Sequence, residues 1–285
     1  MISHLRHLRL PFNLLLSPIY LWGVLLAGGT IRSLNFWVGY LTLHIFLYGG
    51  GTAFNSWYDQ DEGPIGGMAE PVPTERGLLA FSIIWQTIGL PLALWIGWGF
   101  TVTWLLLALL MAAYSHPLTR LKAKPILALL AVALGQGATG FAAGWLVGCP
   151  ALSSLWQRDA LWGMASTALL VTGLYVVTQS YQAAEDSARG DQTLPVILGP
   201  RRALYAAVAL LGAGGALLLA MIVPRFGIGW ALGLALLLAA PTLGLLRWAR
   251  QIEAQTTLKN YATAMRLTTT SALILTAFLL FHLRR

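Results

Sequence analysis

Long apolar runs separated by short polar segments extend over the whole sequence. A helix needs about 20 consecutive apolar residues to cross a hydrocarbon core about 30 Å thick. Nine runs come close to this length or exceed it, and glycine, proline or charged residues stand between them. The pattern therefore predicts nine transmembrane helices, at residues 11–29, 35–55, 77–97, 99–115, 126–148, 160–180, 203–223, 228–246 and 266–283.

The segments between these runs are short, and no low-complexity tract or soluble appendage remains. Arg6 and Arg9 precede the first run, as basic residues do in a signal peptide. That run has no clear small-x-small cleavage site and is long enough to span a bilayer, so we expect a retained helix. The expected fold is an all-α polytopic membrane protein with a single domain, residues 1–285.

Composition supports the membrane assignment. The chain is 57% hydrophobic and only 10% charged, whereas an average soluble domain is about 25% charged. The formal net charge of +8 is therefore read as a topology signal and not as a nucleic-acid footprint. The single cysteine, Cys149, excludes an intrachain disulfide.

The basic residues predict an orientation. If the N-terminus and every second loop lie in the cytoplasm, that side holds 13 of the 18 Lys and Arg residues. This excess follows the positive-inside rule and predicts an odd number of helices with the N-terminus inside. Nine of the ten carboxylates fall on the same side, eight of them in two loops. The rule does not require this, so the carboxylates indicate an ion site.

The first acidic stretch follows the second apolar run. Asn55, Asp59 and Glu62 are spaced by four and three residues before Gly63-Pro64. On a helix these three side chains share one stripe, and oxygen donors of this kind suit Mg²⁺. The alternative is a helix end followed by solvated charges.

The second acidic stretch follows the sixth apolar run. Gln182, Glu185 and Asp186 share a helical face at i, i+3 and i+4, and Asp191 comes shortly after them. Two carboxylate-bearing helix ends on one side of the membrane are expected to face each other across a cavity.

A basic loop, residues 114–125, separates the two acidic stretches and carries Arg120 and Lys122. Carboxylates on two edges and cations on a third suit a diphosphate bound through Mg²⁺. The alternative is that the basic residues only set the topology.

These motifs together resemble the UbiA-type family of intramembrane prenyltransferases. The family carries Asn-x-x-x-Asp-x-x-x-Asp after its second helix and Asp-x-x-x-Asp after its sixth. The resemblance covers residues 9–200 and is carried by Asn55, Asp59, Asp186, Arg9-Leu10-Pro11-Phe12-Asn13, Tyr114-Ser115, Arg120-Leu121-Lys122 and Gln192-Thr193-Leu194-Pro195-Val196-Ile197-Leu198-Gly199. It implies a single bundle of about nine helices around a central cavity.

The chain departs from the family pattern at two positions. Gly63 stands where the first motif has its third Asp, and Gln182 where the second has its first. Glu62 is the better geometric substitute for the first loss, because Asp61 points away on a continuing helix. Pro64 can end that helix early, which would let either carboxylate reach an ion. Glu185 is the nearest carboxylate for the second loss.

The resemblance implies Mg²⁺-dependent transfer of a prenyl group from a polyprenyl diphosphate to a lipophilic acceptor, of the aromatic, quinone or pigment type. Cation–π contacts from Tyr58 and Tyr114 suit the allylic cation. Asn13 is expected either to face the cavity or to join two helices. The expected catalytic residues are Asp59, Tyr114, Lys122 and Asp186. The expected donor-binding residues are Asn13, Asn55, Tyr58, Arg120, Lys122 and Gln182, and the expected metal ligands are Asn55, Asp59, Glu62, Glu185, Asp186 and Asp191.

Two other classes of function stay open. A secondary transporter also carries carboxylates in a helical bundle, although its ion sites usually lie near the bilayer midplane. A non-catalytic isoprenoid-binding or assembly protein of the same fold is the second alternative, given the two missing Asp. In each case we expect a multi-pass protein of a cell or organelle inner membrane, with the motif loops on the cytoplasmic side.

Overall fold

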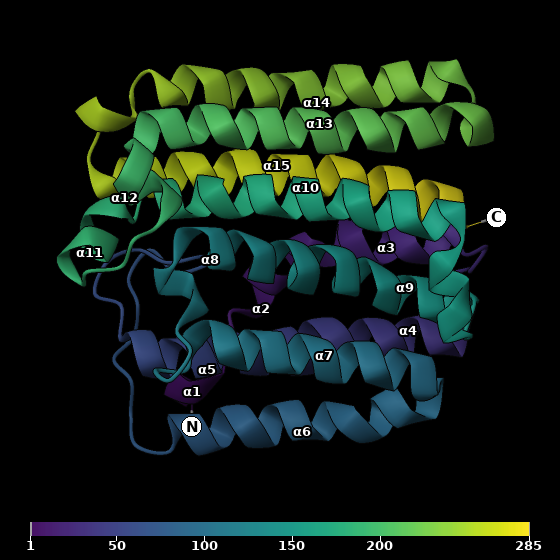
Figure 1. The fold of residues 1–285 in the computed structure, drawn as a ribbon, viewed down its shortest axis with the longest axis horizontal. Coiled ribbons are helices and arrows are strands. Elements are labelled where there is room, and N and C mark those ends of the chain that lie inside the picture. The colour runs from purple at the N-terminus through teal and green to yellow at the C-terminus, as the bar shows by residue number, and fades with distance from the viewer. Residues whose placement is uncertain (1, 285) are drawn as a thin grey trace.

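A computed structural model describes residues 2–284, and in that range every named secondary-structure element is a helix. The long helices run side by side, parallel or antiparallel, in one bundle (Figure 1). The α-helices are α1 (Ile2–His7), α2 (Leu10–Asn13), α3 (Ser17–Leu26), α4 (Leu34–Leu41), α5 (Tyr48–Asp59), α6 (Leu78–Ile96), α7 (Trp98–Ser115), α8 (Pro125–Val132), α9 (Gly140–Gly148), α10 (Arg158–Ser180), α11 (Ala183–Ala188), α12 (Leu194–Leu198), α13 (Pro200–Phe226), α14 (Ile228–Ala249) and α15 (Thr257–Leu283).

Eight helical segments of the described chain are long and apolar enough to cross a membrane. They correspond to eight of the nine predicted spans, and the predicted all-α membrane fold is confirmed. The boundary between the third and fourth spans lies at Gly97, whose φ of 140° separates α6 from α7.

The predicted span at residues 35–55 is not among these eight segments. It is helical throughout, because α4 continues through the π-helical turn η2 (Thr42–Leu47) into α5. This segment contains Asn35, His44 and three consecutive glycines, Gly49 to Gly51, and is therefore less apolar than the others. The count of nine spans stays a prediction.

Glycines let helices approach closely at two contacts. A Cβ atom on Gly144 of α9 would overlap the carbonyl oxygen of Tyr20 on α3. A Cβ atom on Gly214 of α13 would lie 2.9 Å from the carbonyl oxygen of Ser166 on α10. Small residues at helix contacts are the usual means of packing in a membrane, where burial from water supplies no driving force between helices.

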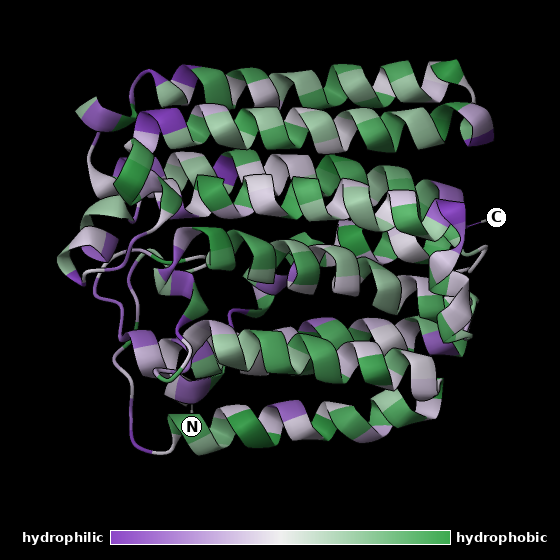
Figure 2. Ribbon diagram, viewed as in Figure 1, coloured by the Kyte–Doolittle hydropathy of each residue, from purple (hydrophilic) through white to green (hydrophobic). Residues whose placement is uncertain are grey.

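The polar loops lie together at one end of the bundle (Figure 2). They follow α5, α7, α10 and α14, and they are the loops that the charge distribution assigned to one side of the membrane. Which side this end faces stays a prediction. The arrangement places the two acidic stretches and the basic loop around the same opening.

We expect Gly144→Ala to destabilise the protein by about 1–3 kcal/mol, because the added methyl group overpacks the contact between α3 and α9. Gly233→Ala is the matched control, since Gly233 lies in α14 with nothing within 4 Å of its Cβ position. Thermal unfolding of both variants in detergent checks this. Equal melting temperatures would contradict the close packing.

Candidate active site

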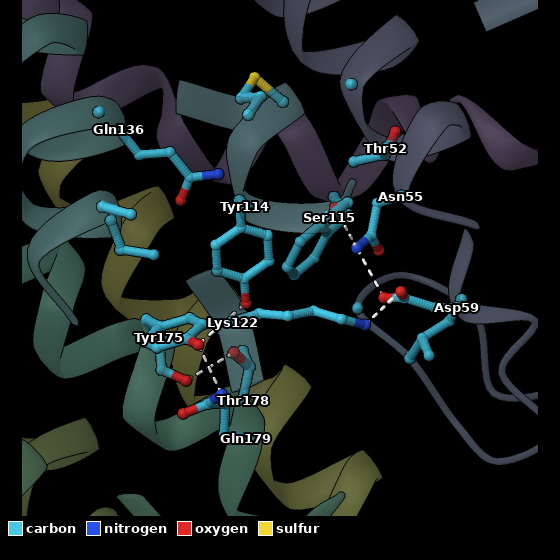
Figure 3. A pocket seen from close by; sticks show the side chains of 18 of the residues that line it. Thr52, Asn55, Asp59, Tyr114, Ser115, Lys122, Gln136, Tyr175, Thr178 and Gln179 are labelled. Atoms are coloured by element: carbon cyan, nitrogen blue, oxygen red, sulfur yellow. Dashed lines mark hydrogen bonds and ion pairs between the residues drawn. The ribbon is translucent and has the colours of Figure 1, made fainter. Parts of the chain in front are cut away.

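A cavity of about 230 Å³ opens at the polar end of the bundle. One water needs about 10–15 Å³, so the cavity has room for a ligand. Its polar end is lined by residues of α5, the basic loop and the second acidic stretch, and its apolar part by residues of α7, α8 and α10 (Figure 3). The apolar lining includes Leu107, Leu110, Met111, Val132, Val171 and Leu174. The cavity therefore suits a ligand with a charged head and an apolar tail.

Asp59 and Lys122 form an ion pair at the polar end, and each side chain is only 9% exposed. The Asn55 side-chain amide donates one hydrogen bond to Asp59 Oδ2 (2.7 Å) and another to Ser115 Oγ (2.9 Å) (Figure 3). These contacts join the end of α5 to the end of α7 and to the basic loop. Asn55, Asp59 and Lys122 therefore lie together, as the sequence predicts.

The basic loop has a backbone shape that turns Lys122 inward. Arg120 takes a left-handed conformation (φ 37°) just before the short 3₁₀ helix Leu121–Ala123. Gln192 donates its backbone N–H to the carbonyl oxygen of Ala123 (3.1 Å), which holds this loop against the second acidic stretch. In this loop conformation the Lys122 ammonium contacts the buried carboxylate of Asp59.

Asp186 and Gln182 line the opposite side of the cavity. Asp186 lies in α11, and the hydroxyl of Thr193 donates a hydrogen bond to its Oδ2 atom (3.2 Å). Burial raises the pKa of Asp186 to about 6, although this hydrogen bond opposes the shift. Asp186 therefore lines the cavity as predicted, on the side formed by the end of α10 and by α11.

Asp191 lines the cavity, but its carboxylate is held by Arg120. Arg120 donates from Nε to Oδ1 and from Nη2 to Oδ2, both at 3.1 Å, in a two-pronged contact. Arg120 is not among the residues that line the cavity. The structure therefore pairs the predicted metal ligand with the predicted diphosphate ligand, and their nearest contact is with each other.

The prediction that Glu62 continues the helical stripe of Asn55 and Asp59 is wrong. Helix α5 ends at Asp59, because Gln60 takes a left-handed conformation (φ 48°) and the chain leaves helical geometry. As a result Glu62 is exposed and does not line the cavity, whereas Asp61 lines it. Glu185 is also absent from the lining, because its carboxylate turns toward the loop and accepts the N–H of Glu62 (3.0 Å).

Tyr114 lines the cavity as predicted, and its hydroxyl donates to the Tyr175 hydroxyl (2.9 Å). The side chain of Gln179 donates to the same Tyr175 oxygen (2.6 Å). Tyr58 does not line the cavity, since its ring packs against Phe54 and His116. The tyrosines at the cavity therefore come from α7 and α10, and Tyr175 is one that the sequence did not nominate, while Phe12 of α2 adds a third aromatic side chain to the lining.

Asn13 is buried and lines the cavity, and its amide donates to the carbonyl oxygen of Leu8 (2.8 Å). Arg9 also lines the cavity, and its guanidinium donates to the hydroxyl of Ser56 (2.6 Å). Sequence reasoning treated Arg9 as a topology signal and missed its place here. The available signal was the motif Arg9-Leu10-Pro11-Phe12-Asn13, from which only Asn13 was nominated for the cavity.

Arg189 is the second cation that sequence reasoning missed, and it lines the cavity between the two acidic stretches. It forms ion pairs with Asp61 (2.7 Å) and with Glu185. Burial lowers the pKa of Arg189, but these two carboxylates outweigh that effect and raise it above its ordinary value.

Within residues 2–284, no three His, Cys, Asp or Glu side chains lie close enough together to hold a metal ion by themselves. The side chains that do line the polar end include carboxylates and amides with hard oxygen donors. Mg²⁺ is commonly bound by one or two carboxylates together with substrate phosphates. The donor set therefore fits an Mg²⁺ ion that binds with a diphosphate.

The chain matches known proteins at the level of family and fold. The UbiA prenyltransferase family model matches residues 16–281. No curated protein matches the sequence. A UbiA homologue from Aeropyrum pernix K1, solved without ligand, is 19% identical, with a TM-score of 0.69 and coverage of 97% of this chain and 98% of that one.

Two further solved structures share the fold. A UbiA homologue from Archaeoglobus fulgidus bound to DMAPP and Mg²⁺ is 20% identical, with a TM-score of 0.65 and coverage of 96% of this chain and 99% of that one. A digeranylgeranylglyceryl phosphate synthase is 17% identical, with a TM-score of 0.63 and coverage of 99% and 98%. At these identities the structural likeness shows a common fold.

The raised pKa of Asp186 predicts a pH-dependent stability. Between pH 3.8, the ordinary value, and about 6 the folded protein holds a proton on Asp186 that the unfolded chain has lost. The free energy of unfolding of the metal-free protein therefore falls as the pH rises through this window, by at most about 1.4 kcal/mol per pH unit.

Thermal unfolding in a metal chelator at about pH 5 and about pH 7 measures this effect. The difference between the two melting temperatures is expected to shrink in Asp186→Asn, because the amide does not titrate. An unchanged difference in that variant would show that other groups produce the pH dependence.

Proposed function

This chain belongs to the UbiA prenyltransferase family, and we propose that it transfers a prenyl group from an allylic polyprenyl diphosphate to a lipophilic acceptor within the membrane. The observation that carries the proposal is the cavity itself. Asp59, Lys122 and Asp186 line its polar end, and leucine, valine and methionine side chains of α7, α8 and α10 form its apolar part. The Mg²⁺ and DMAPP in the Archaeoglobus fulgidus homologue support the same class of donor.

The diphosphate is assigned to the polar end. The Lys122 ammonium and the Arg9 guanidinium both face this part of the cavity and are largely buried. Charge-assisted hydrogen bonds from such groups to phosphate oxygens are about twice as strong as neutral ones. Lys122 exchanges its contact with Asp59 for a phosphate oxygen, which frees the carboxylate for a metal ion.

Asn55, Asp59, Gln182 and Asp186 are the residues that would hold Mg²⁺, each through a side-chain oxygen. When bound, the ion supplies Lewis-acid neutralisation of the charge on the leaving diphosphate. The protein's own contribution is to present these oxygens from two sides of the cavity.

The prenyl chain is assigned to the apolar lining. The bond between the allylic carbon and the diphosphate oxygen breaks, and its electron pair leaves with the diphosphate. The acceptor then supplies an electron pair to the allylic carbon and loses a proton. The faces of Tyr114 and Tyr175 stabilise positive charge on that carbon, by about 0.5–2 kcal/mol per contact, and the apolar walls exclude water that would compete with the acceptor.

The acceptor type, the orientation in the membrane and the extent of the domain each have separate support. A lipophilic acceptor of the aromatic, quinone or pigment type suits a cavity within the bilayer. The positive-inside distribution of Lys and Arg supports a polar end that faces the cytoplasm. The fold match spans nearly the whole chain and supports one catalytic domain over residues 1–285.

Asp59→Asn and Asp186→Asn should each lower Mg²⁺-dependent diphosphate release by about 100-fold or more, as loss of a preorganised charge-stabilising group does. The assay uses purified protein in lipid nanodiscs with geranyl diphosphate and a lipid extract as the source of acceptor. Glu253→Gln is the control, because Glu253 is an exposed carboxylate outside the cavity.

Mass spectrometry of the lipids identifies the prenylated product. Wild-type protein that binds geranyl diphosphate but releases no diphosphate with any extract would favour a non-catalytic isoprenoid-binding protein. Full activity in Asp59→Asn would remove the role given to that carboxylate.

A further inference from the structure

Arg189 spans the gap between the two acidic stretches at the cavity wall. Its Nη1 atom donates to Asp61 Oδ1 (2.7 Å) in the loop after α5, and its Nη2 atom pairs with Glu185 one helical turn earlier in α11. The side chain is 22% exposed and lines the cavity. A guanidinium has five N–H donors, so these two contacts leave three for a ligand.

Glu185 fixes this arrangement through the backbone of the opposite loop. Its Oε1 atom accepts the N–H groups of Glu62 (3.0 Å) and Gly63 (3.4 Å) as well as the pair with Arg189. Two carboxylates from different segments therefore hold one guanidinium, and the loop backbone holds one of those carboxylates. A cation held this way is oriented before a ligand arrives, which lowers the entropy cost of binding.

The absence of a side chain at Gly63 leaves room for the carboxylate of Glu185. A Cβ atom on Gly63 would lie 2.5 Å from Glu185 Oε2, so the carboxylate occupies the space that a side chain at position 63 needs. Position 63 is where the sequence departs from the family pattern by lacking a carboxylate. In this chain a carboxylate reaches the same space from the other acidic stretch.

We propose that Arg189 is a fixed binding group for the substrate diphosphate, that Asp61 and Glu185 are its positioning residues, and that Gly63 has no side chain because Glu185 occupies its place. The inference rests on the proposed function, since it names a further residue for the same donor. It assigns to an arginine, and not to a third metal-binding carboxylate, the charge that faces the diphosphate on this wall.

Arg189→Gln tests the binding role. The dissociation constant of geranyl diphosphate, titrated in nanodiscs with Mg²⁺, is expected to rise about tenfold or more, as loss of a charge-assisted contact predicts. The KM is expected to rise more than kcat falls, since the contact already exists in the bound ground state. Arg189→Lys should lie between wild type and Arg189→Gln, because it keeps the charge and loses the planar fork.

Arg202→Gln is the matched control, an exposed arginine at the start of α13 that removes the same charge. Its dissociation constant should equal that of wild type. Equal weakening in Arg202→Gln and Arg189→Gln would reduce the effect to net charge and overturn the inference.

A double-mutant cycle tests whether Gly63 and Glu185 depend on each other. Gly63→Asp and Glu185→Ala are each expected to weaken geranyl diphosphate binding, the first by displacing Glu185 and the second by freeing Arg189. The double variant Gly63→Asp/Glu185→Ala should recover at least part of the loss, because the carboxylate introduced at position 63 can occupy the vacated space and pair with Arg189. Losses that simply add in the double variant would overturn the pairing.

Different results would overturn the proposed function and the role of Arg189. Wild-type protein that neither binds nor cleaves an allylic diphosphate would overturn the proposed function. Wild-type protein that does both, while Arg189→Gln binds geranyl diphosphate equally well and melts at the same temperature, would overturn this inference alone.

Discussion

The buried ion pair between Asp59 and Lys122 is the contact on which the polar end of the cavity depends. Both side chains are only 9% exposed, and a charge left without its partner in such a place costs about 3–5 kcal/mol. The pair fixes the end of α5 against the basic loop, and through Asn55 and Ser115 it also fixes the end of α7. Under the proposed function, a diphosphate with Mg²⁺ replaces both halves of this pair, so the contact that stabilises the cavity does not prevent binding.

The other carboxylates of the cavity follow the same principle with one exception. Asp61 pairs with Arg189 and Asp191 pairs with Arg120. Asp186 forms no ion pair with any residue of the described chain, and its one side-chain hydrogen bond comes from the Thr193 hydroxyl. Burial raises its pKa, and this effect outweighs the Thr193 hydrogen bond and the more distant charges of Lys122 and Arg189, which lower it. Asp186 is therefore the carboxylate that gains most from a metal ion, because no basic side chain has to leave first.

The sequence predicts most of the fold because hydrophobic length and loop alternation are local properties. It also predicts the positions of Asn55, Asp59 and Lys122 in the cavity, since the first two share a helical face and the third is in the only basic loop between the acidic stretches. It does not predict the position of Glu62, because the left-handed Gln60 ends the helix at Asp59. The only sequence signal for an early helix end was Pro64. The sequence fails for Arg9 and Arg189, because a basic residue at a membrane boundary is normally a topology signal. Whether such a residue meets a carboxylate is decided by contacts distant in sequence, as between Arg189 and Asp61.

The central claim is that this cavity binds an allylic diphosphate with its charged head between the two acidic stretches. The most direct measurement is a structure of the protein in nanodiscs with Mg²⁺ and a thio-analogue of geranyl diphosphate that resists cleavage. We expect density for the diphosphate within contact of Lys122, a metal ion in contact with Asp59 or Asp186, and the prenyl chain along the apolar wall formed by α7, α8 and α10. An analogue bound elsewhere, or an Asp59–Lys122 pair left intact beside a bound analogue, would contradict it.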